Sequence, residues 1–96
     1  MKAKFYVILI DTKVSEAVKS SVYFGGFSPS KLMSDTEIIE TNIPNAVKYD
    51  TKAEAESMCS IIKEYMEKNE AFNDPHIYIE EIEAEYKIQT VIEFLH

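Results

Sequence analysis

Arginine is absent from the sequence, and all ten basic residues are lysines. Arginine grips phosphate through two parallel hydrogen bonds and serves as the arginine finger of phosphoryl transfer, so both kinds of site are excluded. The net charge is −7 at pH 7. Direct binding of nucleic acid through its backbone requires a basic surface, which this composition does not supply. We therefore expect no direct contact with nucleic acid.

Cysteine and histidine are also scarce. The single cysteine, Cys59, cannot form a disulfide within the chain, which is typical of a cytosolic protein. The two histidines, His76 and His96, have no second ligand at metal-binding spacing. We therefore predict a cytoplasmic protein with no metal site and no cofactor.

Long hydrophobic runs are missing. The apolar run Phe5–Ile10 ends at Asp11, whereas a membrane-spanning helix needs about 20 apolar residues. It predicts a buried β-strand and neither a signal peptide nor a membrane anchor. With 96 residues, of which 46% are hydrophobic, the chain is expected to form a single domain over residues 1–96.

Catalytic motifs are missing as well. No serine lies in a G-x-S-x-G turn, and Gly25-Gly26 lacks the GK[ST] ending of a phosphate-binding loop. Cys59 falls on the apolar side of a predicted helix, which favours a buried structural thiol over a nucleophile. We predict that the protein is not an enzyme.

The clearest element of the sequence is a helix over residues 51–69. Thr51 and Glu54 have the spacing of a capping box, in which two side chains satisfy the unpaired amides at a helix start. Apolar residues then recur at steps of three and four, which places them on one face of the helix. These residues are Ala55, Met58, Cys59, Ile62, Tyr65 and Met66.

Segments with high β propensity surround this helix. The predicted strands are Phe5–Ile10 at the centre of the sheet, Ser21–Phe24, Thr36–Thr41 and His76–Tyr86. Residues 11–21 fit a loop or a single turn, and residues 87–96 fit a strand or a short helix equally well. Because the first connections are too short for helical crossovers, we predict an α+β fold: a small antiparallel sheet with element order β-β-β-α-β and the helix on one face.

The pair Gly25-Gly26 permits a positive φ or a β-bulge, and Pro29 interrupts a regular ladder. One interpretation is a turn whose aromatic residues cover the end of the core. The other is a protruding loop in which Phe24 and Phe27 serve as binding anchors.

The acidic residues concentrate at the end of the chain. From Glu67 onward eight acids and two lysines give −6, which leaves −1 for the first 66 residues. In His76–Tyr86 the apolar alternation slips by one at Glu80-Glu81, and a bulge there would keep both apolar sets on the core side. Glu81, Glu83 and Glu85 would then point outward in a row.

Such a row has a pitch of about 6.6 Å, similar to the spacing of phosphates along an extended nucleic-acid strand. It would therefore fit the basic channel of a nucleic-acid-binding protein as a nucleic-acid mimic. The alternative is a solvated strand face that keeps the protein soluble and protects a sheet edge. The candidate partner-binding residues are Glu80, Glu81, Glu83, Glu85, Asp74, Phe24 and Phe27, and Glu93 would extend the patch.

Four segments of the chain form a familiar series: the strand FYVILID, the turn YFGGFS, the helix entry TNIPNAVKYDTKAEAE and the closing strand IYIEEIEAEY. This series resembles small acidic proteins encoded by phages and prophages of low-GC Gram-positive bacteria. The matching pattern, TNxxxAxKYxTKxEAE, is met by Thr41, Asn42, Ala46, Lys48, Tyr49, Thr51, Lys52, Glu54, Ala55 and Glu56. The resemblance implies an accessory protein made during infection, in a class that includes anti-CRISPR and other anti-defence inhibitors.

These observations predict a non-enzymatic protein-binding protein in the host cytosol. Its partner would be a host defence or nucleic-acid-binding protein with a basic surface. Two alternatives remain. One is an oligomeric binder of nucleotides or other small ligands that uses the Gly25-Gly26 loop. The other is a structural or assembly subunit whose free sheet edge mediates self-association into a homo-oligomer.

Overall fold

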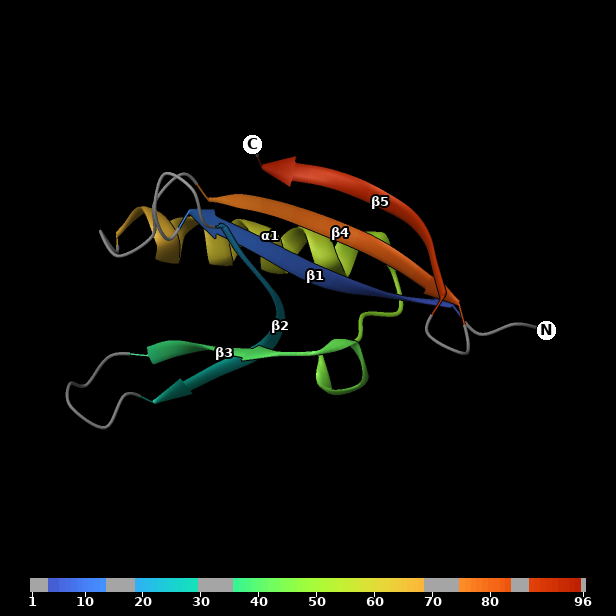
Figure 1. The fold of residues 1–96 in the computed structure, drawn as a ribbon, viewed down its shortest axis with the longest axis horizontal. Helices are drawn as coiled ribbons and strands as arrows, with labels where there is room; N and C mark the ends of the chain where they lie inside the picture. Colours follow the sequence, from blue (N-terminus) through green and yellow to red (C-terminus); the bar gives the residue numbers. More distant parts are fainter. Residues whose placement is uncertain (1–3, 14–18, 30–35, 69–74, 84–86, 96) are drawn as a thin grey trace.

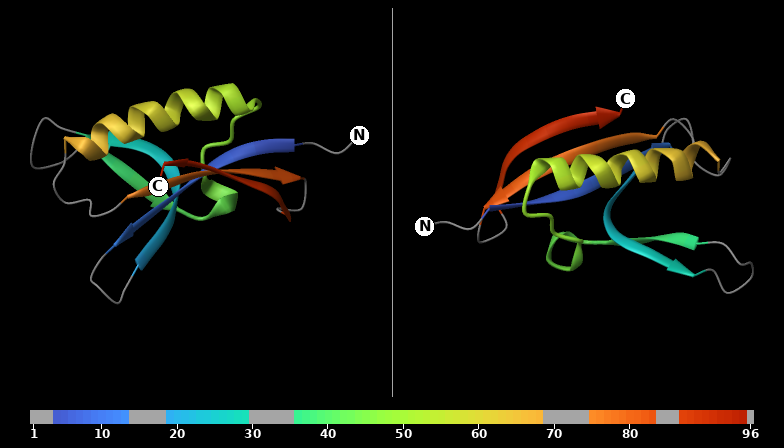
Figure 2. Two further views of the ribbon diagram at one scale, coloured as in Figure 1. Left: turned by 90° about the horizontal axis from the view of Figure 1, so that it is seen from above. Right: turned by 180° about the vertical axis from the view of Figure 1, so that it is seen from behind.

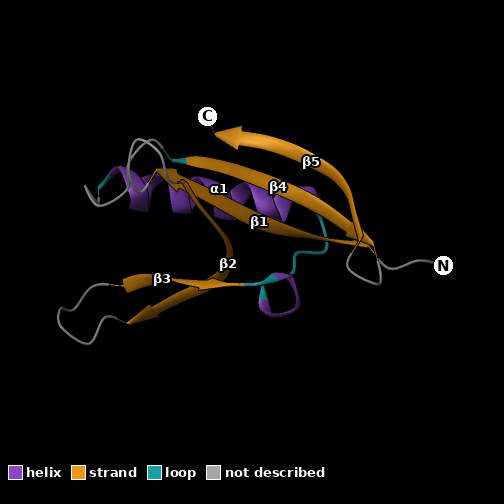
Figure 3. Cartoon of the chain, viewed as in Figure 1, coloured by secondary structure: helices purple, strands orange, loops and turns teal. Residues whose placement is uncertain are grey.

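The computed structural model describes residues 4–13, 19–29, 36–68, 75–83 and 87–95. In chain order the elements are β1 (Lys4–Lys13), β2 (Lys19–Pro29), β3 (Thr36–Thr41), the 3₁₀ turn η1 (Ile43–Asn45), α1 (Lys52–Glu67), β4 (His76–Glu83) and β5 (Lys87–Leu95). The five strands form one antiparallel sheet in the order β3-β2-β1-β4-β5, and α1 lies across one face (Figures 1 and 3). The predicted α+β class is confirmed.

Strand β1 is central, as its continuous apolar run predicts, because it is buried on both faces. Ile8 and Ile10 belong to the core beneath α1. Val7 points to the opposite face, where it packs in a second, smaller cluster with Ile82 and Ala46. We call this second side of the sheet the outer face. A strand with two covered faces has no polar alternation, which explains the unbroken apolar sequence.

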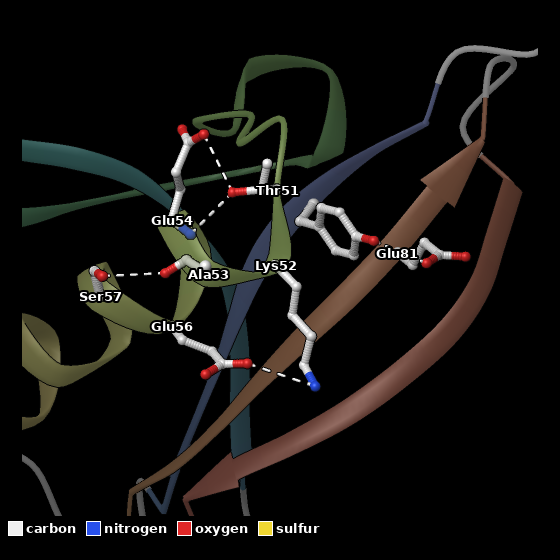
Figure 4. A network of polar contacts seen from close by, with 8 residues as sticks. Thr51, Lys52, Ala53, Glu54, Glu56, Ser57 and Glu81 are labelled. Atoms are coloured by element: carbon white, nitrogen blue, oxygen red, sulfur yellow. Dashed lines mark hydrogen bonds and ion pairs between the residues drawn. The ribbon is translucent and has the colours of Figure 1, made fainter.

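Helix α1 has the predicted cap and the predicted buried face. The hydroxyl of Thr51 accepts a hydrogen bond from the Glu54 backbone amide at 3.2 Å and donates one to the Glu54 carboxylate at 3.2 Å (Figure 4). Ala55, Cys59, Ile62 and Met66 are buried, and Met58 and Tyr65 pack beside them. This face covers β1 and β4 when the molecule is seen from behind (Figure 2).

Strand β2 contains both glycines and bends sharply. It pairs with β1 only as far as Tyr23, and then it turns away and carries β3 with it (Figures 1 and 2). The ladder with β3 shifts between Phe24 and Phe27, and Gly26 has a φ of 107°. The expected bulge and positive φ are confirmed, but the segment is a strand and neither a turn nor a protruding loop.

Residues 42–49 fill the space that β2 leaves beside β1. Tyr6 and Tyr49 exchange two backbone hydrogen bonds, of 2.8 and 2.9 Å, and the Val47 amide donates to the Phe24 carbonyl at 3.1 Å. This segment therefore closes the sheet locally and leads directly into α1.

Strand β4 departs from its prediction. It pairs with β1 without interruption from Glu83 to His76, so the bulge predicted at Glu80-Glu81 is wrong. The irregularities lie in β5, where Gln89 and Phe94 are the extra residues. β5 also settles the ambiguous tail as a strand.

Because β4 has no bulge, its apolar residues point to different faces. Ile77 and Ile79 lie beneath α1, and Ile82 lies on the outer face, yet all three are fully buried. The prediction assumed one buried face, whereas β4 has two.

Candidate functional site

Among the residues predicted to bind a partner, those that the structure describes do not form one surface. Asp74 and Glu85 lie outside the described residues. Phe24 is only 1% exposed. Phe27 meets Phe24 and Tyr65 edge-on, with ring centroids 5.2 and 5.5 Å apart. These two phenylalanines pack in and against the core, so the prediction of protruding aromatic anchors is wrong.

The described glutamates of β4 divide between the two faces of the sheet. Successive residues of a strand point to opposite sides. Glu81 and Glu83 lie opposite Tyr6 and Lys4 of β1 on the side of α1, and Glu80 lies on the outer face. For these residues the predicted outward row is wrong, because it depended on the bulge that β4 lacks.

Glu80 is a buried carboxylate, with an exposed fraction of 4%. Its Oε1 accepts a hydrogen bond of 2.5 Å from the hydroxyl of Tyr23. Burial, together with this hydrogen bond, raises the pKa of Tyr23 above its usual value near 10. The pair connects β2 to β4 across β1, so Glu80 holds the fold together rather than extending a surface patch.

Further polar groups lie near this pair on the outer face. Partial burial raises the pKa of Tyr78, and the carboxylates of Glu93 and Asp11 raise it further. The Oδ1 atom of Asp11 is buried and has no hydrogen-bond partner among the described residues. No sequence motif marks Asp11, Tyr23 or Tyr78 as functional residues. The alternation Tyr78-Glu80-Ile82 could have indicated the shared position of these three residues, because in an unbroken strand alternate residues lie on one side.

A second set of carboxylates is carried by the start of α1 and by the end of β4 on the α1 side of the sheet. Tyr6 contacts both segments. The Tyr6 backbone pairs with Tyr49 just before the helix, and the Tyr6 hydroxyl donates to Glu81 Oε2 at 3.0 Å. This hydrogen bond raises the pKa of Tyr6. Figure 4 shows Glu81 on β4 together with Glu54 and Glu56 of the first turn of α1, whose carboxylates point in different directions. We call the acids of these two segments the acidic corner: Asp50, Glu54, Glu56, Glu81 and Glu83.

Two lysines partly neutralise the acidic corner. Lys4 Nζ lies 3.6 Å from Glu81 Oε1, and Lys52 Nζ lies 3.5 Å from Glu56 Oε1. The Lys52–Glu56 pair is exposed and the Lys4–Glu81 pair is partly exposed, so each contributes about 0–1 kcal/mol to stability. Five carboxylates and two lysines give these seven residues a net charge of −3, and Glu83 also pairs with Lys87 in the ladder between β4 and β5. The corner is therefore a negative surface, with Asp50 and Glu54 exposed and the other three acids half-buried.

Cys59 is fully buried in the middle of α1, as its position on the apolar stripe predicts. Burial raises the pKa of its thiol to about 12. A thiolate is the reactive form of cysteine. Cys59 therefore acts as a small apolar core residue.

Tyr49→Phe is expected to raise the free energy of unfolding at pH 7 by about 1 kcal/mol. The Tyr49 hydroxyl is buried and has no hydrogen-bond partner among the described residues. An unpaired buried polar group costs about 1–3 kcal/mol. Urea denaturation followed by circular dichroism measures the change, and a loss of stability would show that the hydroxyl has a partner.

The same variant has a pH signature. Burial raises the pKa of Tyr49 to about 12 in the folded protein, against about 10 in the unfolded chain. Between these two pKa values the folded state keeps the Tyr49 proton whereas the unfolded chain loses it. Stability is therefore constant below about pH 10 and falls as the pH rises towards 12. Tyr49→Phe is expected to lose less stability than the wild type over that interval.

The described part of the chain contains no group of three histidine, cysteine, aspartate or glutamate side chains that could hold a metal ion. No helix in the same part is long and apolar enough to cross a membrane. Comparisons with protein-family models, curated proteins and solved structures find no match. The function is therefore inferred from the surfaces described above.

Proposed function

We propose that this chain is a non-enzymatic binding protein that attaches to a basic surface of another protein through its acidic corner. The observation that supports this most directly is the joining of two acidic segments by Tyr6. The loop and first turn of α1 supply Asp50, Glu54 and Glu56, and the end of β4 supplies Glu81 and Glu83. Complementary charge speeds encounter with a partner and fixes its orientation.

Two carboxylates of the corner are held in place before any partner arrives. Glu54 is bound to the cap residue Thr51, and Glu81 is bound to Tyr6. Side chains that are already ordered lose less conformational entropy on binding. At the other end of α1, Glu67 lies 3.9 Å from Lys63, and Lys63, Glu64, Glu67 and Lys68 together carry no net charge.

The partner that fits this surface is a host protein whose basic channel or patch normally holds nucleic acid. A rigid cluster of carboxylates would compete with phosphate groups for such a channel. Glu54 and Glu56 also belong to the segment that resembles phage-encoded proteins. We therefore infer a phage accessory protein that acts in the cytosol of the infected cell as an inhibitor of a defence or nucleic-acid-binding protein.

The test compares two variants with the same change in charge. Asp50→Lys/Glu83→Lys reverses two acids of the corner and spares the helix cap, whereas Glu40→Lys/Glu64→Lys reverses two exposed acids on β3 and α1. With each protein as bait in a lysate of a low-GC Gram-positive bacterium, the wild type is expected to retain a basic protein that elutes as salt increases. The corner variant is expected to lose at least about tenfold in affinity, and the control variant to keep it.

Nucleic acid provides a second readout. A short duplex or single strand is expected to compete with the wild-type chain for the captured protein. If the corner variant binds the same protein with unchanged salt dependence, the acidic corner is not the binding surface. If binding is lost but nucleic acid does not compete, the partner uses its basic surface for another purpose.

A further inference from the structure

Two lysines of the chain lie beside the acidic corner, and each is paired with one of its carboxylates. Lys4 Nζ lies 3.6 Å from Glu81 Oε1. Lys52 Nζ lies 3.5 Å from Glu56 Oε1. The second oxygen of Glu81 is also engaged, because it accepts the hydrogen bond from the Tyr6 hydroxyl. A basic group that approaches these two carboxylates therefore meets a cation of the chain itself.

We propose that Lys4 and Lys52 compete with a basic partner for the acidic corner, so that binding requires their displacement and is weakened by it. This inference rests on the proposed function, because the competition exists only if a partner uses this surface. The two lysine side chains are 54% and 50% exposed, and an exposed ion pair contributes little to stability. Each lysine can therefore leave its carboxylate without disturbing the fold.

Distance distinguishes this pair of lysines from another lysine on the same helix. Lys63 pairs with Glu67 at 3.9 Å near the end of α1. With a rise of about 1.5 Å per residue, Lys63 lies about 16 Å along the helix from Lys52. Salt screens exposed charges beyond about 8 Å at physiological ionic strength. The charge of Lys63 is therefore largely screened at the corner, whereas those of Lys4 and Lys52 act there directly.

A synthetic oligolysine peptide is the probe, and isothermal titration calorimetry at about 0.15 M salt measures its affinity for the full chain. Lys4→Met and Lys52→Met remove the charge and keep an aliphatic side chain. Each is expected to tighten binding by about two- to fivefold, which corresponds to the strength of an exposed ion pair. Lys63→Met makes the same change in net charge and is the matched control. It is expected to bind the peptide as the wild type does.

Two charge-reversal variants show whether the peptide binds at the corner. Asp50→Lys/Glu83→Lys is expected to weaken binding more than Glu40→Lys/Glu64→Lys, which reverses the same number of acids elsewhere. Equal losses in the two variants, or a wild type that does not bind the peptide, would contradict the proposed function and this inference together.

A different outcome contradicts the inference alone. If the peptide binds at the corner, but Lys4→Met and Lys52→Met bind it no more tightly than Lys63→Met, the two lysines do not compete with the partner. The proposed function would then stand without this regulation. Circular dichroism confirms that the three methionine variants are folded before their affinities are compared.

Discussion

Tyr23→Phe is expected to lower the free energy of unfolding by about 2–4 kcal/mol at pH 7. The substitution removes one oxygen atom and keeps the ring. That oxygen donates the 2.5 Å hydrogen bond to Glu80, whose exposed fraction is 4%. Without the donor, a buried carboxylate loses its partner, and the cost of its desolvation is no longer offset. Urea denaturation followed by circular dichroism measures the loss.

Two further variants separate the hydrogen bond from the loss of any tyrosine hydroxyl. Tyr78→Phe removes a hydroxyl from the same face of the sheet and is expected to change stability by no more than about 0.5 kcal/mol. Tyr23→Phe/Glu80→Leu removes both partners, and because no charge is left buried it is expected to be more stable than Tyr23→Phe alone. If Tyr23→Phe costs no more than Tyr78→Phe, Glu80 is satisfied by another group.

The expected outcome for Tyr23 is opposite in sign to that for Tyr49, although both are tyrosines whose pKa burial raises. The difference lies in the hydroxyl. That of Tyr23 has an acceptor, and that of Tyr49 has none among the described residues. The two variants Tyr23→Phe and Tyr49→Phe together therefore test whether hydrogen bonding or burial determines how a buried hydroxyl affects the free energy of unfolding.

Features that depend on neighbours in the sequence were predicted correctly. The cap at Thr51 and the buried face of α1 follow from spacing within one helix, and both are confirmed. The central position of β1 follows from an apolar run that only a strand covered on both faces can carry. In each case the sequence pattern and the structure it specifies occupy the same few residues.

The predictions that proved wrong concern contacts between segments that are far apart in the sequence. Glu80 is buried because Tyr23, 57 positions away, reaches across β1 to bind it. The pattern of β4 alone contains no sign of that contact. The burial of β4 on both faces was interpreted as a bulge. The second face is covered by η1 and by the bend of β2, and the hydrophobic pattern of β4 itself does not reveal that layer.

The acidic corner also depends on a contact between segments that are far apart in the sequence. The excess of glutamate in β4 was visible in the sequence, but its relation to the start of α1 was not. That relation depends on Tyr6, whose hydroxyl binds Glu81 across a separation of 75 residues. Composition therefore indicated the kind of surface, and only the fold located it.

Gly25→Val is expected to destabilise the protein by about 3 kcal/mol, although valine is by far the better strand former. A Cβ at this position would lie 3.0 Å from Ile39 Cγ2, 3.1 Å from Thr41 Cγ2 and 3.2 Å from the Ile39 carbonyl oxygen. The last of these atoms belongs to the backbone of β3, so it cannot move without separating β3 from β2. Thermal and urea unfolding measure the effect.

Gly26→Ala is the matched control, because at this position the backbone conformation, and not a steric contact, opposes a side chain. A Cβ there would have room, with Val47 Cγ2 as its near neighbour at 3.8 Å, but the φ of 107° is unfavourable for any other residue and costs about 1–3 kcal/mol. Gly25→Ala is expected to cost less than Gly25→Val, because alanine adds only the Cβ, whereas Gly26→Ala and Gly26→Val should cost similar amounts. Equal stability of Gly25→Val and the wild type would mean that β3 does not pack against the bend. Because the bend directs residues 42–49 to Tyr6, Gly25→Val is also expected to weaken binding through the acidic corner.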